Sequence, residues 1–333
     1  MIALLEPSNH GTGNFARRKA AQMSSEQSDV SFHTPVLLRE TRDLLAPAPG
    51  KLFIDGTLGG GGHSAALLDA GARVIALDRD RDALEFAKER IGNAGEKFRA
   101  VHANFADLDR VLDELQIAQI DGALLDLGVS SWQLDTASRG FSFMRGGPLD
   151  MRMNPASGIT AAEFVSSASV EELERVFREF GEEPAARRIA VRLVRERETR
   201  PLATTTDLAE AVESIIPRRG KTHPATRVFQ ALRIAVNHEL ENLALALELF
   251  STRLRSGGRF AVITFHSLED RMVKQFFKQR SIEFLDRPEW PAPRPNPDFK
   301  FKLVTRKAVV ASPEEQTANP RSRSAKLRVV EKI

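Results

Sequence analysis

The sequence contains no cysteine and no tyrosine, and none of its apolar runs is long enough to cross a membrane. The absence of cysteine excludes disulfides, thiolate metal ligands and thiol nucleophiles. The chain also lacks the apolar core of a signal peptide, so the sequence predicts a cytoplasmic protein with no membrane attachment. A hydrophobic content of 42% and a charged content of 28% over 333 residues are typical of a globular protein with one large domain or two.

The net charge is only +3, but basic residues are concentrated in one part of the chain. Between Ala185 and Ala235 eleven Lys or Arg residues stand against five acids, and four more cations follow near the C-terminus. Arg188, Arg192 and Arg195 would form a basic stripe on a helix predicted over 184–198. Such clustering indicates a polyanionic partner, although an ordinary solvated helix face explains it equally well at this stage.

A glycine-rich loop between two predicted strands is the most informative part of the sequence. An apolar run over 51–55 ends in Asp55, four glycines follow at 59–62, and a second apolar run over 73–78 ends in Asp78. Glycine lets the backbone approach a ligand closely, and the second acid can accept hydrogen bonds from both hydroxyls of a ribose. The pattern therefore predicts a nucleotide-binding half-site rather than a flexible turn without a ligand.

The residues of this loop also favour one nucleotide over another. A dinucleotide-binding loop usually has spaced glycines and places a pyrophosphate on a helix N-terminus. Here the glycines are contiguous, and Asp55 would repel a pyrophosphate but suits a ligand with a cationic amine or sulfonium. The loop thus favours S-adenosylmethionine over NAD.

Strands and helices alternate from residue 51 to residue 126, which predicts a parallel sheet with crossover helices. A long loop follows over 127–158, then helical patterns that end with one over 224–250, and the sheet resumes near residue 259. Five prolines predict an extended loop over 287–297. We expect an α/β, Rossmann-like fold with an inserted helical domain. Its predicted parts are a disordered extension (1–30), the α/β domain (31–139 and 226–333) and the insertion (140–225).

Long motifs occur in order along the chain: H-T-P-V-L-L from His33, D-G-T-L-G-G-G-G-H-S from Asp55, L-D-L-G-V-S-S from Leu125, R-G-F-S-F-M-R from Arg139, H-P-A-T-R from His223 and F-H-S-L-E-D-R from Phe265. Together they resemble the bacterial 16S rRNA cytosine-N4 methyltransferases, the MraW family. The resemblance covers the chain from His33 to the C-terminus. The N-terminal extension and the proline-rich loop near residue 290 lie outside the motifs.

This resemblance implies an S-adenosylmethionine-dependent methyltransferase that modifies N4 of a cytidine in the decoding centre, at the P site, of 16S rRNA. The partner would be 16S rRNA within the small ribosomal subunit, and a homodimer is compatible with the sequence. No metal is expected, because no two histidines have the spacing of metal ligands. Two alternatives stay open: a methyltransferase for another nucleic acid such as DNA, and a non-catalytic RNA-binding assembly factor.

Carried over residue by residue, the cofactor contacts of the family fall on seven positions: Gly61, Gly62, His63, Asp78, Phe105, Asp126 and Gln133. Phe105 would offer its ring to adenine. Asp126 is also a catalytic candidate, because an acceptor for N4–H could orient the amine and help to localise its lone pair. His266 is the second candidate, as part of a polar wall of the base pocket. A hydrolase with adjacent His266 and Ser267 would lack the G-x-S-x-G turn.

The partner that would stack on the target base is not evident from the motifs. Many amino methyltransferases carry an Asn or Asp-Pro-Pro-aromatic motif after the fourth strand, whereas this chain reads Asp126-Leu-Gly-Val. Stacking must therefore come from elsewhere, and Trp132, Phe141 and Phe143 are candidates. Packing is the commoner role for each of them.

Overall fold

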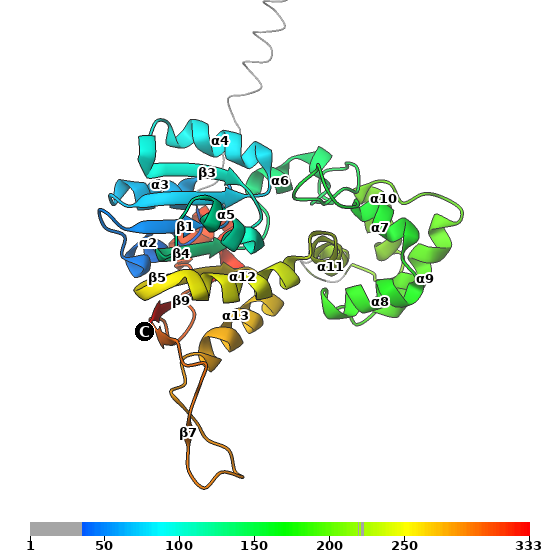
Figure 1. The fold of residues 1–333 in the computed structure, drawn as a ribbon. Helices are drawn as coiled ribbons and strands as arrows, with labels where there is room; N and C mark the ends of the chain where they lie inside the picture. Colours follow the sequence, from blue (N-terminus) through cyan, green and yellow to red (C-terminus); the bar gives the residue numbers. More distant parts are fainter. Residues whose placement is uncertain (1–34, 219, 221–222) are drawn as a thin grey trace, which may run out of the picture. The chain divides into compact units, whose positions relative to one another are not determined.

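The computed structural model describes residues 35–218, 220 and 223–333, and the extension predicted over residues 1–30 lies outside them. Its seven-stranded sheet has the order β3-β2-β1-β4-β5-β9-β8 (Figure 1). Five strands are parallel: β1 (Leu52–Asp55), β2 (Arg73–Asp78), β3 (Phe98–His102), β4 (Ile120–Asp126) and β5 (Leu254–Thr264). The sheet is completed by β9 (Lys326–Lys332), which runs antiparallel to β5 and to the edge strand β8 (Phe301–Leu303).

The strand order reverses between β1 and β4. The chain builds outward from β1 through β2 to β3, and then returns to place β4 on the other side of β1. At such a switch point the carboxyl ends of neighbouring strands border a crevice in which ligands bind. Asp55 ends β1 opposite Leu124, and Asp126 ends β4 two residues further on. The predicted Rossmann-like α/β fold is confirmed, and its two acids lie at the expected edge of the sheet.

Helices cover both faces of the sheet, as the nearly continuous apolar runs of its strands require. Because side chains alternate along a strand, Phe53 packs on one face while Leu52 and Ile54 pack on the other. The helices of the first face are α2 (Leu38–Leu45), α3 (Gly62–Asp69) and α4 (Arg81–Ile91). Those of the second face are α5 (Leu108–Glu114), α12 (Glu239–Arg253) and α13 (Ser267–Gln279).

The chain between β4 and α12 forms a helical segment with a hydrophobic core of its own. Its longer helices are α7 (Ala161–Ser167), α8 (Val170–Glu179), α9 (Ala186–Arg197), α10 (Thr205–Glu213) and α11 (Thr226–Asn237). Phe177 of α8, Leu193 of α9 and Leu232 of α11 are all fully buried in this core. The predicted division into an α/β domain (31–139 and 226–333) and an insertion (140–225) stays a proposal. By these bounds α11 belongs to the α/β domain, but its buried side chains contribute to the core of the helical segment.

Three local predictions differ from the structure. The single helix predicted over 224–250 is divided at His238, whose φ of 50° is left-handed and ends α11 before α12 begins. The loop predicted over 127–158 contains the short helix α6 (Ser131–Asp135) and a 3₁₀ turn, η3 (Ala137–Arg139). The proline-rich segment is not only a loop, since β6 (Phe284–Leu285) and β7 (Arg294–Pro295) pair in a two-stranded ribbon.

A further short helix, α14 (Pro313–Ala318), precedes β9. Among the described residues, no helix combines the length and the apolar character that a membrane span needs.

Candidate functional site

The loop after β1 is shaped by Asp55, whose side chain is almost fully buried. One carboxylate oxygen accepts the hydroxyl of Ser64 at 2.7 Å, and the other accepts the N–H of Thr57 at 3.1 Å. Burial raises the pKa of Asp55 to about 6, although both hydrogen bonds act to lower it. Because Asp55 is almost fully buried and its two oxygens bond to the loop and α3, it acts on the crevice chiefly through the conformation of the loop.

Asp78 joins the end of β2 to the glycine loop. Its Oδ2 accepts the N–H of Gly59 at 2.8 Å, and its Oδ1 accepts the N–H of Asp80 at 2.9 Å. Burial raises the pKa of Asp78, and the charge of Asp80 adds to the effect. A carboxylate offers about four acceptor positions, so these two bonds leave capacity for two hydroxyls of a ligand. The structure thus joins the acid to the glycine loop, and the binding of a nucleotide by the two stays a prediction.

The glycines of the loop have two different structural roles. Gly61 has a φ of +74° as the N-cap of α3, a conformation that glycine adopts without strain. A Cβ on Gly62 would lie 2.1 Å from Cγ of Pro35, so this glycine is required by packing. Their predicted contacts with a cofactor stay predictions.

Asp126 at the end of β4 carries an unused acceptor. Its side chain is 25% exposed, and its Oδ1 is buried without a hydrogen-bond partner among the described residues. Burial raises the pKa of Asp126 to about 8, and the charges of Asp55 and Glu269 add to the effect. Nε2 of His63 lies 3.7 Å from Oδ2 of Asp126, and burial lowers the pKa of His63 to about 4. A neutral imidazole and an unsatisfied carboxyl thus meet at the crevice.

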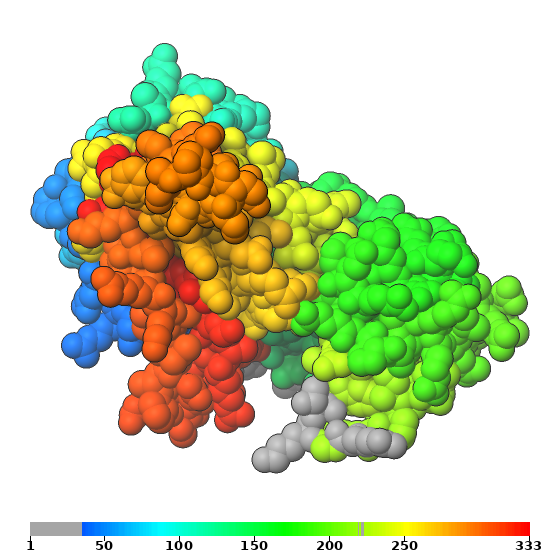
Figure 2. Space-filling model, turned by 90° about the horizontal axis from the view of Figure 1, so that it is seen from below, coloured from blue at the N-terminus to red at the C-terminus, as the bar shows by residue number. Residues whose placement is uncertain are grey.

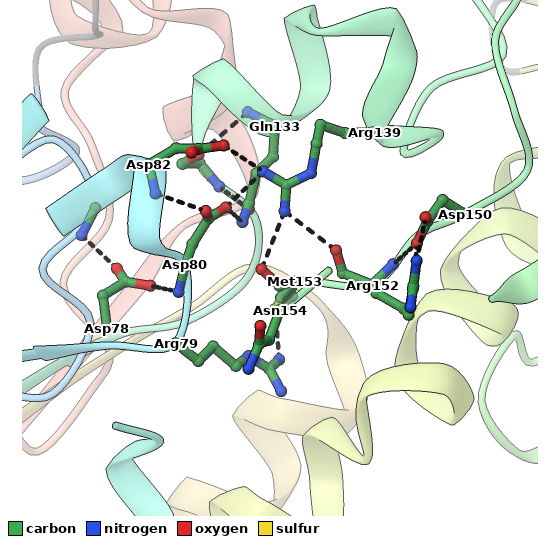
Figure 3. A network of polar contacts seen from close by, with 12 residues as sticks. Asp78, Arg79, Asp80, Asp82, Gln133, Arg139, Asp150, Arg152, Met153 and Asn154 are labelled. Carbon is green, nitrogen blue, oxygen red and sulfur yellow. Dashed lines mark hydrogen bonds and ion pairs between the residues drawn. The ribbon is translucent and has the colours of Figure 1, made fainter. Parts of the chain in front are cut away.

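A buried ion pair connects the turn after β2 to the segment after β4 (Figure 3). Oδ2 of Asp80 accepts Nη1 of Arg139 at 2.7 Å and Nε2 of Gln133 at 2.7 Å. The side chain of Arg139 is only 8% exposed, and its Nη2 donates to the carbonyl oxygens of Arg152 and Met153 at 3.1 and 3.0 Å. The Oε1 of Gln133 accepts the N–H of Ser130 at 3.0 Å. Gln133 is thus engaged in the wall of the site, and its predicted cofactor contact stays a prediction.

A second set of contacts joins the same turn to α11. Nη1 of Arg79 donates to the carbonyl oxygen of Asn237 at 3.1 Å, and its guanidinium also contacts the sulfur of Met153. The side-chain oxygen of Asn237 accepts the N–H of Met153 at 2.8 Å, and its Nδ2 donates to the carbonyl oxygen of Met151 at 2.8 Å. Sequence reasoning gave Arg79, Asp80 and Arg139 no role. Two of them stand in motifs that could have drawn notice: Asp80 is the second acid of L-D-R-D, and Arg139 is the first residue of R-G-F-S-F-M-R.

His266 lies at the N-terminus of α13 and forms a cap. Its Nδ1 accepts the N–H of Glu269 at 3.4 Å, and its Nε2 lies 3.0 Å from Oε1 of Glu269. Burial acts to raise the pKa of Glu269, but the hydrogen bond from His266 and the charges of His266 and Arg233 outweigh it and lower that pKa. This capping explains the F-H-S-L-E-D-R motif in part. A catalytic role for His266 stays a prediction.

Glu239, His266 and Glu269 are the one group among the described residues whose ligand atoms are close enough for a metal ion, within 4.8 Å of one another. Both oxygens of Glu239 are already engaged, because the guanidinium of Arg233 donates to them at 2.8 and 2.9 Å. Arg233 therefore supplies a cation at this place, which disfavours a divalent ion.

The aromatic candidates differ in their surroundings. Phe105 begins the 3₁₀ turn η2 (Phe105–Asp107) after β3 and is partly exposed, which is compatible with a ligand. Phe141 is buried in the core of the helical segment, and Phe143 stacks on His223 with 4.3 Å between ring centroids. Trp132 is partly exposed and lies 5.0 Å from the guanidinium carbon of Arg139. Of the three stacking candidates, Phe141 is buried, whereas Trp132 and Phe143 are both partly exposed.

A sheet with antiparallel β9 between β5 and β8, and a glycine loop bonded to the acid of β2 at the switch point, define a Rossmann-like methyltransferase. The chain belongs to the MraW methylase family, whose sequence profile matches residues 30–333, and the expected resemblance is confirmed. It is 50% identical over 311 residues to the ribosomal RNA small subunit methyltransferase H of Syntrophotalea carbinolica, covering 92% of this chain and 99% of that protein. The protein of the same name from Anaeromyxobacter dehalogenans is 53% identical over 304 residues, covering 90% and 98%.

Proposed function

We propose that this protein transfers a methyl group from S-adenosylmethionine to N4 of a cytidine in 16S rRNA, in the decoding centre at the P site. Its relatives are named as methyltransferases of small-subunit ribosomal RNA. The observation that carries the proposal is the unsatisfied Oδ1 of Asp126 at the β1–β4 switch point. Asp126 lies beside the glycine loop, because its N–H donates to Oγ1 of Thr57 at 2.6 Å. The substrate would be 16S rRNA within the small ribosomal subunit in the cytoplasm, and a homodimer is compatible with this.

The residues at the crevice fit the methyl donor. Asp78 would accept the two ribose hydroxyls with its remaining acceptor positions, and the partly exposed ring of Phe105 would contact adenine. The buried, unpaired oxygen of Asp126 lies where a cationic or amino group would satisfy it. When bound, S-adenosylmethionine supplies an activated methyl group on a cationic sulfur, and no metal is needed for the transfer.

Asp126 would act on the amine of the target base. The reaction forms a nitrogen–carbon bond, breaks a sulfur–carbon bond and releases one proton from N4. An ionised Asp126 accepts N4–H, which orients the amine, and a pKa near 8 makes it a competent acceptor for that proton. A positive charge bound nearby would lower this pKa and favour the ionised form.

Methyl incorporation into three substrates tests the proposal: purified small ribosomal subunits that lack the modification, protein-free 16S rRNA, and DNA. We expect label in the small subunits or in the free rRNA, and nuclease digestion should identify it as N4-methylcytidine. Label in DNA alone would favour the alternative nucleic-acid substrate. No heat of binding for S-adenosylmethionine would favour the non-catalytic assembly factor.

Asp78→Asn should weaken the binding of S-adenosylmethionine by about tenfold or more. Hydrogen bonds to a charged acceptor contribute about 1.5–3 kcal/mol each, and each 1.4 kcal/mol is a factor of ten in affinity. Calorimetric titration measures the change, and Asp69→Asn, an exposed acid at the end of α3, is the matched control. An unchanged dissociation constant in Asp78→Asn would show that Asp78 shapes the loop but does not bind the donor.

A further inference from the structure

Most cations of the helical segment already have a partner within the chain. Arg178 and Arg187 both pair with Glu174, and Arg192 pairs with Glu196 at 3.1 Å. Arg188 donates to the carbonyl oxygen of Ile215 at 3.2 Å. The basic stripe predicted on α9 is therefore engaged at two of its three positions. The stripe therefore supports a polyanionic partner less strongly than the sequence suggests.

The cations near the C-terminus are engaged in the same way. Lys326 and Arg328 of β9 both pair with Asp270, at 3.2 and 2.8 Å, and Arg321 pairs with Asp135 at 3.0 Å. Most cations in the two basic regions of the sequence, 185–235 and the C-terminus, are thus engaged by acids or carbonyl oxygens of the same chain.

A different stretch carries six cations that have no carboxylate partner among the described residues. They are Arg287, Arg294, Lys300, Lys302, Arg306 and Lys307. All but Lys300 are exposed, and the stretch contains only two acids, Glu289 and Asp298. We call these six cations and Trp290 the ribbon surface. Uncompensated charge of one sign in a short stretch marks a surface that attracts a polyanion.

The ribbon that carries part of this surface has a fixed base. The buried Asn296 donates through Nδ2 to the carbonyl oxygens of Gln279 and Ile282, both at 2.8 Å. Its backbone N–H donates to the carbonyl oxygen of Glu283 at 2.8 Å. Prolines at 288, 291, 293, 295 and 297 further restrict the backbone. Figure 1 shows the ribbon extending beyond α13, away from the sheet. A surface anchored in this way loses little conformational entropy on binding.

At the tip, two guanidinium groups lie over one aromatic ring. The guanidinium carbons of Arg287 and Arg294 are 5.0 and 4.8 Å from the ring centroid of Trp290. Arginine presents a planar fork of donors that matches phosphate, and both arginine and tryptophan stack on unpaired bases. This combination suits RNA better than a purely acidic protein surface, which offers no bases.

The positive charge continues from the ribbon onto the edge of the sheet. Lys300 precedes β8, and Lys302 lies on this edge strand. Burial lowers the pKa of Lys332 on the neighbouring β9, and the charge of Lys300 lowers it further. Figure 2 shows the ribbon and the segment that follows it on the same face of the molecule.

We propose that the ribbon surface binds the phosphate backbone of ribosomal RNA, at a place separate from the crevice that would hold the methyl donor. This inference rests on the proposed function, because it takes rRNA as the substrate. Binding there would raise the affinity for the RNA without touching the reacting atoms, so it would act on KM and leave kcat unchanged.

The test compares two triple variants of the full-length protein. In Arg287→Gln/Arg294→Gln/Lys302→Gln three cations of the ribbon surface are neutralised. In the control, Arg39→Gln/Arg110→Gln/Arg175→Gln, three exposed arginines that pair with Asp43, Glu114 and Glu179 are neutralised instead. Both variants lose the same charge. Purified 16S rRNA is titrated at several salt concentrations, and methylation of small subunits is measured in parallel.

The slope of log affinity against log salt concentration should become shallower by about 0.7 for each lost phosphate contact, roughly 2 in total for the ribbon variant. Its KM for the rRNA substrate should rise by about tenfold or more at moderate salt, with kcat at saturation and S-adenosylmethionine binding unchanged. The control variant should retain the slope and the KM. Circular dichroism should show both variants folded, since all six side chains are exposed.

Several outcomes would overturn the inference. The wild-type slope and KM in the ribbon variant would do so, and so would equal losses in both variants, which would reflect net charge alone. Weaker binding to small subunits with unchanged binding to free rRNA would indicate a ribosomal protein as the partner. If the wild-type protein methylates none of the RNA substrates, the proposed function fails, and the RNA titration still decides whether the ribbon surface binds RNA.

Discussion

Replacing Asp126 with asparagine should reduce methyl transfer by about 10²- to 10⁴-fold, the usual contribution of a positioned acid–base group. The amide keeps the size of the side chain but is a far weaker acceptor for N4–H and cannot take its proton. Single-turnover transfer at saturating donor and RNA measures the loss, with calorimetric binding of S-adenosylmethionine alongside. Equal losses of transfer and donor binding would show that Asp126 is a ligand of the donor only.

The same variant should be more stable than the wild type at neutral and basic pH. The pKa of Asp126 is raised from the ordinary 3.8 to about 8 by burial, so the folded protein binds more protons than the unfolded chain between these values. Stability is therefore lost as the pH rises through this window, and asparagine removes that loss. We expect a gain of about 1–3 kcal/mol at pH 8.5, the usual cost of one unsatisfied buried group, and almost none at pH 4.

Urea unfolding of the wild type, Asp126→Asn and the exposed control Asp69→Asn at both pH values measures this difference. The rate in the wild type should also depend on pH. Because the ionised form is the acceptor, kcat/KM should rise as the pH approaches 8 from below. A gain in stability that is equal at both pH values would mean that ionisation of Asp126 is not its cause.

Arg139→Gln should destabilise the protein by about 3–5 kcal/mol, the typical effect of removing one partner of a buried ion pair. The substitution leaves the carboxylate of Asp80 buried with only Gln133 and the N–H of Asp82 as donors. It also removes the donors to the carbonyl oxygens of Arg152 and Met153. Urea unfolding compares it with Arg145→Gln, an exposed arginine of the same segment that donates to the carbonyl oxygen of Asp135. The control should change stability by less than about 1 kcal/mol.

The double variant Asp80→Asn/Arg139→Gln separates lost charge pairing from lost packing. It removes both charges and keeps side chains of similar size, so most of the stability should return. If the double variant is as unstable as the sum of the two single ones, the ion pair is not what stabilises this junction.

The sequence predicted the sheet and the edge at which its acids meet. Strand ends are local features, because the apolar runs that stop at Asp55, Asp78 and Asp126 are visible in a few residues. The period of two along β1 directs Phe53 to one face and its neighbours to the other, and this too is encoded locally.

What the sequence could not predict depends on partners far apart in the chain. Burial is the main cause of the raised pKa of Asp126, and the charge of Glu269, more than a hundred residues away, adds to it. Gln133 donates to Asp80 across 53 positions. The break at His238 follows a backbone angle that no composition signal marks. The ion pair of Arg192 with Glu196 could be suspected, because the two are four residues apart on a predicted helix. The ion pair of Arg328 with Asp270 could not, because the two are far apart in the chain.

The contact between Gly62 and Pro35 has a consequence for how the glycine motif is interpreted across relatives. A side chain at position 62 would collide with the ring of Pro35, whether or not a ligand is bound at the loop. Natural selection would therefore retain this glycine for folding alone. A descendant that had lost its methyl donor would be expected to keep Gly62 while Asp78 and Asp126 drifted, so the two acids are the better markers of an active enzyme.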